Sequence, residues 1–490
     1  MRLRPTSLVF TLVVLLASAT AAVAQSRPAS TPTNSLRFAA ADLGRDLFKN
    51  AVNIQSPSSE PQIPTTDNRA CDGCPRRRVT MAFAQALGVN VMYNLANRLR
   101  PGEAVHMRVN WNTWWANLKH GLEWDENPFL VNQIGHPYQG NNYYTAARAN
   151  GMSFWESTSV AAFGSATWEF FGEVNKPSLN DLINTTLGGI ALGEMFHRTG
   201  WLIRDTQATG RGRLMQEIAA AVIDPMTGVN RFASGDATRV SEKPETMVPS
   251  TLAAYGSMGV LWQGSNTRAV ESKGRTFAEL DLFYGDLTTG RSRTPYDAFN
   301  VRFRFGGGNP VSEARVRGRL LGQPLGADGR YQFTVAQAYD FISNGAYEFG
   351  GQGVLLALKR DYALSSRTSM AVTGGAGVTL LGAVDSVAQR GPERDYDYGP
   401  GTTFAGEAVF ARDDYAFARV AYQGYQLYSV DGARANHVLQ WFRADVLIPL
   451  RGRLALGVTG EYFYRKTYFQ LGGEQRERFP QFRVFFAWRR

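Results

Sequence analysis

Apolar and polar residues alternate one by one through the second half of this 490-residue chain, and this pattern constrains the fold most. In one run, Phe299, Val301, Phe303 and Phe305 are separated by Asn300, Arg302 and Arg304. Successive side chains of a β-strand point to opposite faces, so each such run predicts a strand with one apolar face. We count about 12 runs, which begin near residues 251, 275, 298, 314, 330, 347, 368, 402, 415, 437, 453 and 481.

Such alternation fits either a soluble antiparallel sheet or a transmembrane β-barrel with an apolar outer face. Three features favour the barrel, and the number of predicted strands is the first. Short links at 361–367, 412–414 and 449–452 alternate with expected long ones at 382–401, 429–436 and 466–480, as in barrels with short periplasmic turns. The last residues place Phe482, Val484, Phe486 and Trp488 on one face, typical of a terminal barrel strand. We therefore expect a transmembrane antiparallel barrel over residues 251–490.

The first 24 residues have the pattern of a secretory signal peptide. Arg2 and Arg4 precede an apolar run from residue 8 to 16, and Ala22-Val23-Ala24 is a cleavage site. Beyond it, no run approaches the ~18–20 apolar residues of a membrane-spanning helix. Export combined with a barrel predicts the cell outer membrane, and this class implies assembly by the barrel assembly machinery.

The region between the signal and the barrel divides by composition. Residues 25–78 are rich in Ser, Pro and Thr and are expected to be a flexible leader. Residues 79–224 contain helical patterns at 79–100, 140–150, 154–174, 178–196 and 212–223, and we expect a helical module that is periplasmic or fills the lumen. Residues 225–250 are polar and are expected to be a linker. The overall architecture is therefore mainly β with an α-helical N-terminal module.

Charge and cysteine content restrict the partners. The formal net charge is +10, but export argues against nucleic acid, so anionic outer-membrane lipid and lipopolysaccharide are the expected partners. Cys71 and Cys74 are the two cysteines, and a local disulfide is expected in an oxidising compartment. No cofactor or metal is predicted, and the oligomeric state is not determined by the sequence.

Polar residues that are candidates for chemistry concentrate between Trp111 and His197. Glu169 and Glu173 are four residues apart and are expected to share a helix face, His136 precedes a proline in an expected turn, and Asp181 begins the next helix. A histidine with carboxylates can serve as a general base or hold a divalent metal. The structural alternative is a packed polar core, in which Ser178 and Asp181 form a capping box and the glutamates pair with Arg148 or Arg198.

The same region resembles an uncharacterised bacterial family, the domain of unknown function numbered 3943. The resemblance rests on His136-Pro137-x-x-Gly140, on Trp168-Glu169-x-x-x-Glu173 and on Ser178-x-Asn180-Asp181, and it covers roughly residues 105–200. It implies an exported, envelope-associated protein and supplies no activity and no catalytic residues.

A row of arginines on neighbouring strands is the second candidate feature. Arg302, Arg304, Arg315, Arg317 and Arg319 share one facing and are expected to line the lumen. They form either a basic ladder that selects anionic solutes or pairs with lumenal carboxylates such as Glu279 and Asp281.

Two functions from different classes follow. The first is an outer-membrane barrel with a structural role in the envelope, or with a role in the passage of a solute or lipid. The second is an outer-membrane enzyme, a hydrolase or acyltransferase acting on lipid or lipopolysaccharide, that uses His136, Glu169, Glu173 and Asp181. The sequence contains none of the usual hydrolase or zinc-protease motifs, and it leaves open whether the protein is an enzyme.

Overall fold

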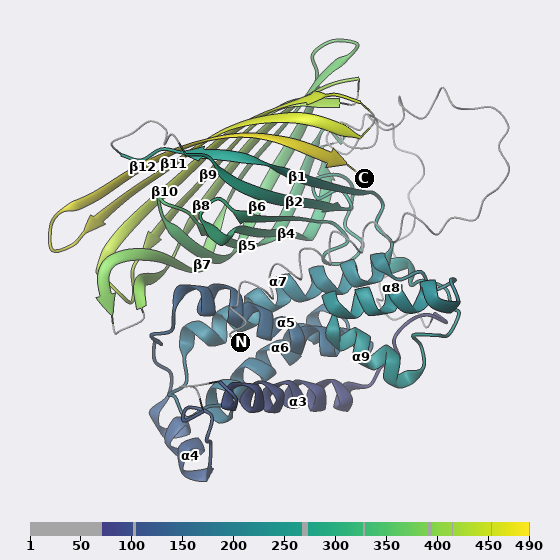
Figure 1. Ribbon diagram of the computed structural model, residues 1–490, viewed down its shortest axis with the longest axis vertical. Helices are drawn as coiled ribbons and strands as arrows, with labels where there is room; N and C mark the ends of the chain where they lie inside the picture. Colours follow the sequence, from purple (N-terminus) through teal and green to yellow (C-terminus); the bar gives the residue numbers. More distant parts are fainter. Residues whose placement is uncertain are drawn as a thin grey trace. The chain divides into compact units, whose positions relative to one another are not determined.

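The computed structural model describes residues 71–100, 104–266, 273–326, 329–390, 394–413, 415–451 and 453–489. These residues form two compact units, a helical one up to residue 248 and a β one from residue 249, with Arg394 grouped with the helical unit (Figure 1). The predicted signal peptide and most of the predicted leader lie outside the described residues. Cys71 and Cys74 form the expected disulfide.

The helical unit is built around three helices that pack on one another: α5, α6 and α7 (Figure 1). Their buried faces carry Tyr143, Tyr144, Trp168 and Trp201, which give the unit an aromatic core. None of the described helices has the length and apolar character required to cross a membrane. The α-helices are α3 (Val79–Arg98), α4 (Trp111–His120), α5 (His136–Ala149), α6 (Phe154–Phe171), α7 (Leu179–Ile203), α8 (Gly210–Ile223) and α9 (Pro225–Ser234), with a π-helix at Val131–Gly135 before α5.

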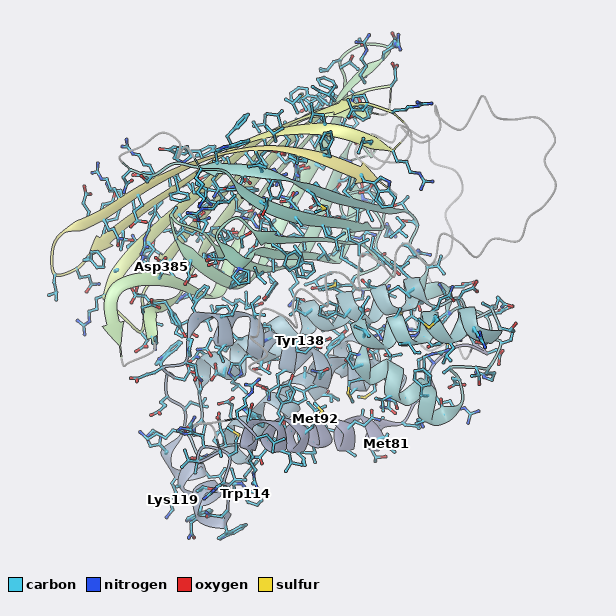
Figure 2. All side chains as sticks on the ribbon, in the orientation of Figure 1. Met81, Met92, Trp114, Lys119, Tyr138 and Asp385 are labelled. Atoms are coloured by element: carbon cyan, nitrogen blue, oxygen red, sulfur yellow. A yellow bond between two sulfur atoms is a disulfide. The ribbon has the colours of Figure 1, made fainter. Side chains whose placement is uncertain are left out.

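The short helix α4 is not among the helices that the sequence pattern predicts. It begins with a capping box, in which Asn110 accepts the Thr113 N–H and the Thr113 side chain accepts the Asn110 N–H. Trp111 and Trp115 on this helix are exposed. Figure 2 shows Trp114 and Lys119 on the same helix.

The expectation of a linker at residues 225–250 is wrong for its first part, because α9 occupies Pro225–Ser234. The side chain of Asp224 accepts the Thr227 N–H and so caps the helix, and Pro225 suits the first helical turn. The polar composition that suggested a linker instead includes Arg231, which is buried against Glu217 of α8.

The β unit is a closed antiparallel barrel in which each strand of the described chain pairs with its sequence neighbours and β1 closes the ring on β12. This confirms the predicted fold class. The strands are β1 (Leu252–Gln263), β2 (Arg275–Tyr284), β3 (Phe299–Gly306), β4 (Asn309–Leu325), β5 (Tyr331–Ser343), β6 (Glu348–Ala363), β7 (Thr368–Arg390), β8 (Arg394–Arg412), β9 (Tyr415–Tyr428), β10 (Ala435–Pro449), β11 (Leu454–Phe469) and β12 (Glu474–Arg489).

Because apolar and polar residues alternate along each strand, apolar side chains point mainly outward from this barrel and polar ones point mainly into its interior. On β1, Met258 points outward and is 69% exposed, whereas its neighbour Ser257 points inward and is 8% exposed. Phe486 of β12 and Leu280 of β2 continue the outer apolar surface around Met258. The apolar outer face is the one that a lipid bilayer would cover.

The loop lengths differ from expectation. The predicted long links at 382–401 and 466–480 are mostly strand, since β7 ends at Arg390 and β8 begins at Arg394, while β11 ends at Phe469 and β12 begins at Glu474. Ladder pairs such as Arg465 with Glu477 extend these hairpins, because alternating polar residues pair across strands as readily as apolar ones do. The predicted short turns are present, whereas two of the three predicted long links are mostly strand. The alternation of side chains therefore predicts this fold more reliably than loop length does.

Candidate functional site

A close approach of α5 and α7 brings the chemically interesting residues of the helical unit together. Gly140 of α5 lies against Gly189 and Thr185 of α7, and a Cβ on Gly140 would lie 1.8 Å from the carbonyl oxygen of Thr185. Glycine is therefore required for the two backbones to approach this closely. Gly140 lies about one helical turn beyond His136 on α5, and Thr185 and Gly189 lie about one and two turns beyond Asp181 on α7. The contact therefore holds His136 and Asp181 close to each other.

His136 is the first residue of α5 and follows the π-helix directly, so the expected turn at this position is wrong. Pro137 suggested the turn, but proline is well tolerated in the first turn of a helix, where its missing N–H is not needed. The imidazole Nδ1 lies 3.3 Å from Thr185 Oγ1, and Nε2 lies 3.6 Å from Asp181 Oδ2. The contact with Thr185 thus orients the imidazole ring so that Nε2 faces the Asp181 carboxylate.

Asp181 makes only half of the predicted capping box. The side chain of Ser178 accepts the Asp181 N–H at 3.2 Å, as the box requires. The return bond is replaced, because the Ser178 N–H donates to Glu169 Oε2 at 2.8 Å. The Asp181 carboxylate is therefore released from the helix end and is directed at His136, while its Oδ1 accepts from the Asn180 side chain at 2.8 Å.

Glu169 is fully buried in α6 and joins the same cluster. Its Oε2 accepts the Ser178 N–H, whereas its Oε1 has no hydrogen-bond partner among the described residues. His136, Glu169 and Asp181 each offer a ligand atom, and these atoms lie within 4.8 Å of one another. Each of the three side chains is at most 9% exposed.

Burial dominates the electrostatics of this cluster, which we call the His136 cluster (His136, Glu169 and Asp181). Burial, together with the nearby charge of Glu173, raises the pKa of Glu169 well above its ordinary value. Burial, together with the charges of Asp125 and Glu169, likewise raises the pKa of Asp181. Burial lowers the pKa of His136, although the charge of Asp125 opposes this effect. The charged forms of all three groups are therefore disfavoured in the absence of a compensating cation.

One further detail of the predicted site is wrong. Glu173 does not share a helix face with Glu169, because α6 ends at Phe171 and Gly172 forms its C-cap. Glu173 is partly exposed and accepts from the Asn175 side chain. Arg148 and Arg198, the alternative partners considered for these glutamates, both pair with Glu194.

The amide-rich surroundings of the cluster are not predicted by the sequence pattern. Asp125 accepts from the side chains of Asn132 and Asn180 at 2.7 and 2.6 Å, which fixes its carboxylate beside the cluster. The only available signal was the frequency of asparagine in this region, which by itself predicts no contact. Both of these bonds to the Asp125 carboxylate come from neutral amide donors.

The lumenal arginines of the barrel form the second candidate site. All five predicted arginines lie within ion-pair distance of a carboxylate: Arg302 pairs with Asp281 at 2.7 Å, Arg304 with Glu279 at 2.7 Å, Arg315 with Glu313 at 3.0 Å, Arg317 with Asp340 at 2.7 Å and Arg319 with Asp297 at 2.9 Å. The arrangement is therefore a set of matched charges rather than an uncompensated basic surface.

Side chains from the strands occupy much of the barrel interior. Near the β5–β6 and β9–β10 turns lies a buried apolar cluster that includes Tyr347, Phe349, Trp441 and Phe463. The guanidinium of Arg315 lies 4.3 Å from the Trp441 ring centre and links this cluster to the charged residues.

A layer of ion pairs follows the apolar cluster and spans strands that are not neighbours. Arg304 of β3 contacts Glu461 of β11 at 3.2 Å. Arg483 of β12 contacts both Glu461, at 3.1 Å, and Glu279 of β2, at 3.0 Å. The interior also contains a cavity of about 320 Å³, whose lining includes Trp441 of the apolar cluster together with Arg302, Arg317, Lys359 and Glu407.

These features define a closed antiparallel barrel with a helical unit that holds a buried histidine–carboxylate cluster. Residues 121–226, which include the His136 cluster, match the family described as Domain of unknown function (DUF3943). This match confirms the resemblance that the His-Pro-x-x-Gly and Ser-x-Asn-Asp motifs indicated.

The solved structures that are similar to this chain include outer-membrane barrels. The NanC porin is 9% identical, with 47% of this chain and 98% of that chain covered and a TM-score of 0.26. A loop-deletion mutant of OmpT, an outer membrane protein of Vibrio cholerae, is 10% identical, with 49% and 99% covered and a TM-score of 0.21. The KdgM porin is 8% identical, with 47% and 98% covered and a TM-score of 0.23. No curated protein matches the chain.

Proposed function

We propose that this protein is an outer-membrane barrel whose lumen is closed by its own side chains and whose role is to anchor its helical unit in the cell envelope. The observation that carries the proposal is the contact of Arg304 on β3 with Glu461 on β11, which joins strands separated by β2, β1 and β12 across the interior. Together with the aromatic cluster around Trp441, this layer favours the function of a scaffold and not that of an open pore.

The outer surface of the barrel supports a membrane location. Met258, Phe486 and Trp488 are outward-facing and exposed, and such a band is stable only when lipid covers it. Outer-membrane lipid and lipopolysaccharide are therefore the proposed surroundings of the β unit.

Conductance across planar lipid bilayers tests the closed lumen. The full-length mature protein is inserted beside an open porin as the positive control, and insertion is verified by a heat-dependent shift in gel mobility. We expect no steady conductance from the wild-type protein. A stable ohmic conductance comparable to that of the porin would contradict the anchor function and support solute passage.

A second candidate function is an enzyme that acts on lipid or lipopolysaccharide through His136, Glu169 and Asp181. The proximity of a histidine and two carboxylates favours it, but their burial argues against direct access of a large substrate. Lipid profiles of cells that carry wild type, His136→Ala or Glu169→Gln test this alternative. Identical profiles from folded variants would eliminate it.

A further inference from the structure

Buried carboxylates elsewhere in the helical unit are compensated by arginine. Glu194 contacts Arg148 at 3.0 Å and Arg198 at 2.8 Å. In the same unit, Glu217 contacts Arg204, Arg213 and Arg231 at 3.1, 2.7 and 2.8 Å. Burying a carboxylate in an apolar interior is unfavourable unless a positive charge accompanies it, so these pairings are the expected arrangement.

The His136 cluster is buried to the same degree but has no such compensation. Within the described part of the chain, neither Glu169 nor Asp181 forms an ion pair with a lysine or arginine, and His136 is the basic partner of Asp181. The nearby Arg394 instead donates to the backbone carbonyl of Asp125 at 2.9 Å. Asp125 adds a further negative charge nearby. The two carboxylates therefore lack the arginine partners that the other buried carboxylates of this unit have.

The orientation of the side chains indicates where a compensating positive charge belongs. Thr185 contacts His136 Nδ1, which leaves Nε2 facing Asp181, and Ser178 occupies Glu169 Oε2, which leaves Oε1 buried without a hydrogen-bond partner among the described residues. Hydrogen bonds that orient a ligating histidine through its second nitrogen are typical of metal sites. Atoms bound to one ion at about 2.0–2.2 Å lie up to about 4.4 Å apart, so the observed limit of 4.8 Å requires only small side-chain rotations.

We propose that His136 Nε2, Glu169 Oε1 and Asp181 Oδ2 bind a divalent cation of the Zn²⁺ or Mn²⁺ class, which joins the N-terminal ends of α5 and α7 to α6. The mixed set of imidazole and carboxylate ligands suits these ions, whereas Ca²⁺ and Mg²⁺ prefer oxygen ligands alone. The two carboxylates balance the charge of the ion. Because the ligands are buried, the ion has a structural role, and the proposal does not depend on the anchor function.

Metal titration of the full-length mature protein in detergent tests the site. The protein is treated with EDTA and dialysed, and ZnCl₂, MnCl₂ and CaCl₂ are then added separately while binding is followed by calorimetry. We expect saturable binding of Zn²⁺ or Mn²⁺, together with a higher melting temperature of the helical unit. Loss of a single ligand in Asp181→Asn or Glu169→Gln should weaken binding by about 100-fold or more, since even changes beyond the ligands cause losses of 10- to 100-fold.

Glu194→Gln is the matched control, because Glu194 is an equally buried carboxylate of α7 that already has arginine partners. This variant should lower the melting temperature while leaving the metal affinity unchanged. Absence of saturable Zn²⁺ or Mn²⁺ binding by the wild type would overturn the proposal, as would binding of Ca²⁺ alone or an unchanged affinity in both ligand variants. The wild-type titration decides the question even if a variant fails to fold.

Discussion

Asp181 directs its Oδ2 at Nε2 of His136, 3.6 Å away, instead of returning a hydrogen bond to the N-terminus of its own helix. Elsewhere in the same unit, Ser153 and Glu156 complete a capping box, with the Glu156 side chain accepting the Ser153 N–H at 2.9 Å. The difference arises because Glu169 already accepts the Ser178 N–H. In this helix-start motif, Ser178 therefore still caps the helix, whereas the Asp181 side chain contacts His136, a residue distant in the sequence.

The glycine contact between α5 and α7 should be essential to this arrangement. In Gly140→Ala, the added Cβ would lie 1.8 Å from the carbonyl oxygen of Thr185, so the helices must separate. We expect a loss of about 1–3 kcal/mol or more in the free energy of unfolding, which is typical of overpacked interiors. Chemical denaturation of the helical unit, followed by far-UV circular dichroism, measures it.

Gly88→Ala is the control, because Gly88 lies within α3 and an added Cβ meets nothing within 4 Å. Replacing an unhindered helical glycine by alanine should stabilise the protein by about 0.5–1 kcal/mol. Equal effects of the two substitutions would show that the α5–α7 approach is not close enough to require glycine.

The sequence predicted the barrel well because the alternation of side chains is a local property of each strand. It predicted the ends of β7, β8, β11 and β12 poorly, since their outer parts are polar and resemble loops. For the His136 cluster, it identified the three residues but not their partners. The pairing of Arg148 with Glu194 and the contact of Ser178 with Glu169 depend on helix packing, which no local pattern encodes.

The ion pairs inside the barrel should contribute strongly to its stability. Glu461 is fully buried and contacts Arg304 and Arg483, so Glu461→Gln leaves these guanidinium groups without one of their counter-charges. We expect a destabilisation of about 3–5 kcal/mol, as for other broken buried pairs. Urea unfolding in detergent, with the gel mobility shift as a second readout, measures this loss.

Glu407→Gln provides the comparison, since Glu407 pairs with Arg419 at 2.6 Å but both side chains are about one-third exposed. This variant should change the stability by only about 0–1 kcal/mol. A loss of the same size in both variants would mean that burial does not set the strength of these pairs.

The helical unit should lose stability in weak acid through His197. This side chain is buried, its Nδ1 lies 3.0 Å from Asp224 Oδ2, and Arg148 and Glu194 also act on it. Burial lowers the pKa of His197 despite the opposing effect of Asp224. Because the folded-state pKa is below the unfolded one, the neutral ring contributes stability above about pH 6.5, and this contribution is lost as the pH falls through the folded-state pKa.

Melting temperatures measured between neutral pH and about pH 5 test this sign. The wild type should become less stable on acidification, and His197→Gln should lose part of that pH dependence. His106→Gln is the control, because His106 is exposed. Identical pH profiles for wild type and His197→Gln would remove His197 as a source of the acid sensitivity.

The outer face of the barrel should respond to charge according to its position along the strand. Met258 lies in the middle of β1, 69% exposed and next to Phe486 of β12, where lipid tails are expected. Met258→Arg should destabilise the folded protein in lipid vesicles by about 2–4 kcal/mol, the range for arginine at the centre of a bilayer.

Leu450→Arg is the control, because Leu450 is 51% exposed in the β10–β11 turn, where headgroups and water are expected. This substitution should change the free energy of folding by only about 0–1 kcal/mol. Folding titrations of both variants into vesicles measure the difference. If the two substitutions had equal and small effects, the band around Met258 would face water or another protein surface, and the membrane location of the barrel would have to be abandoned.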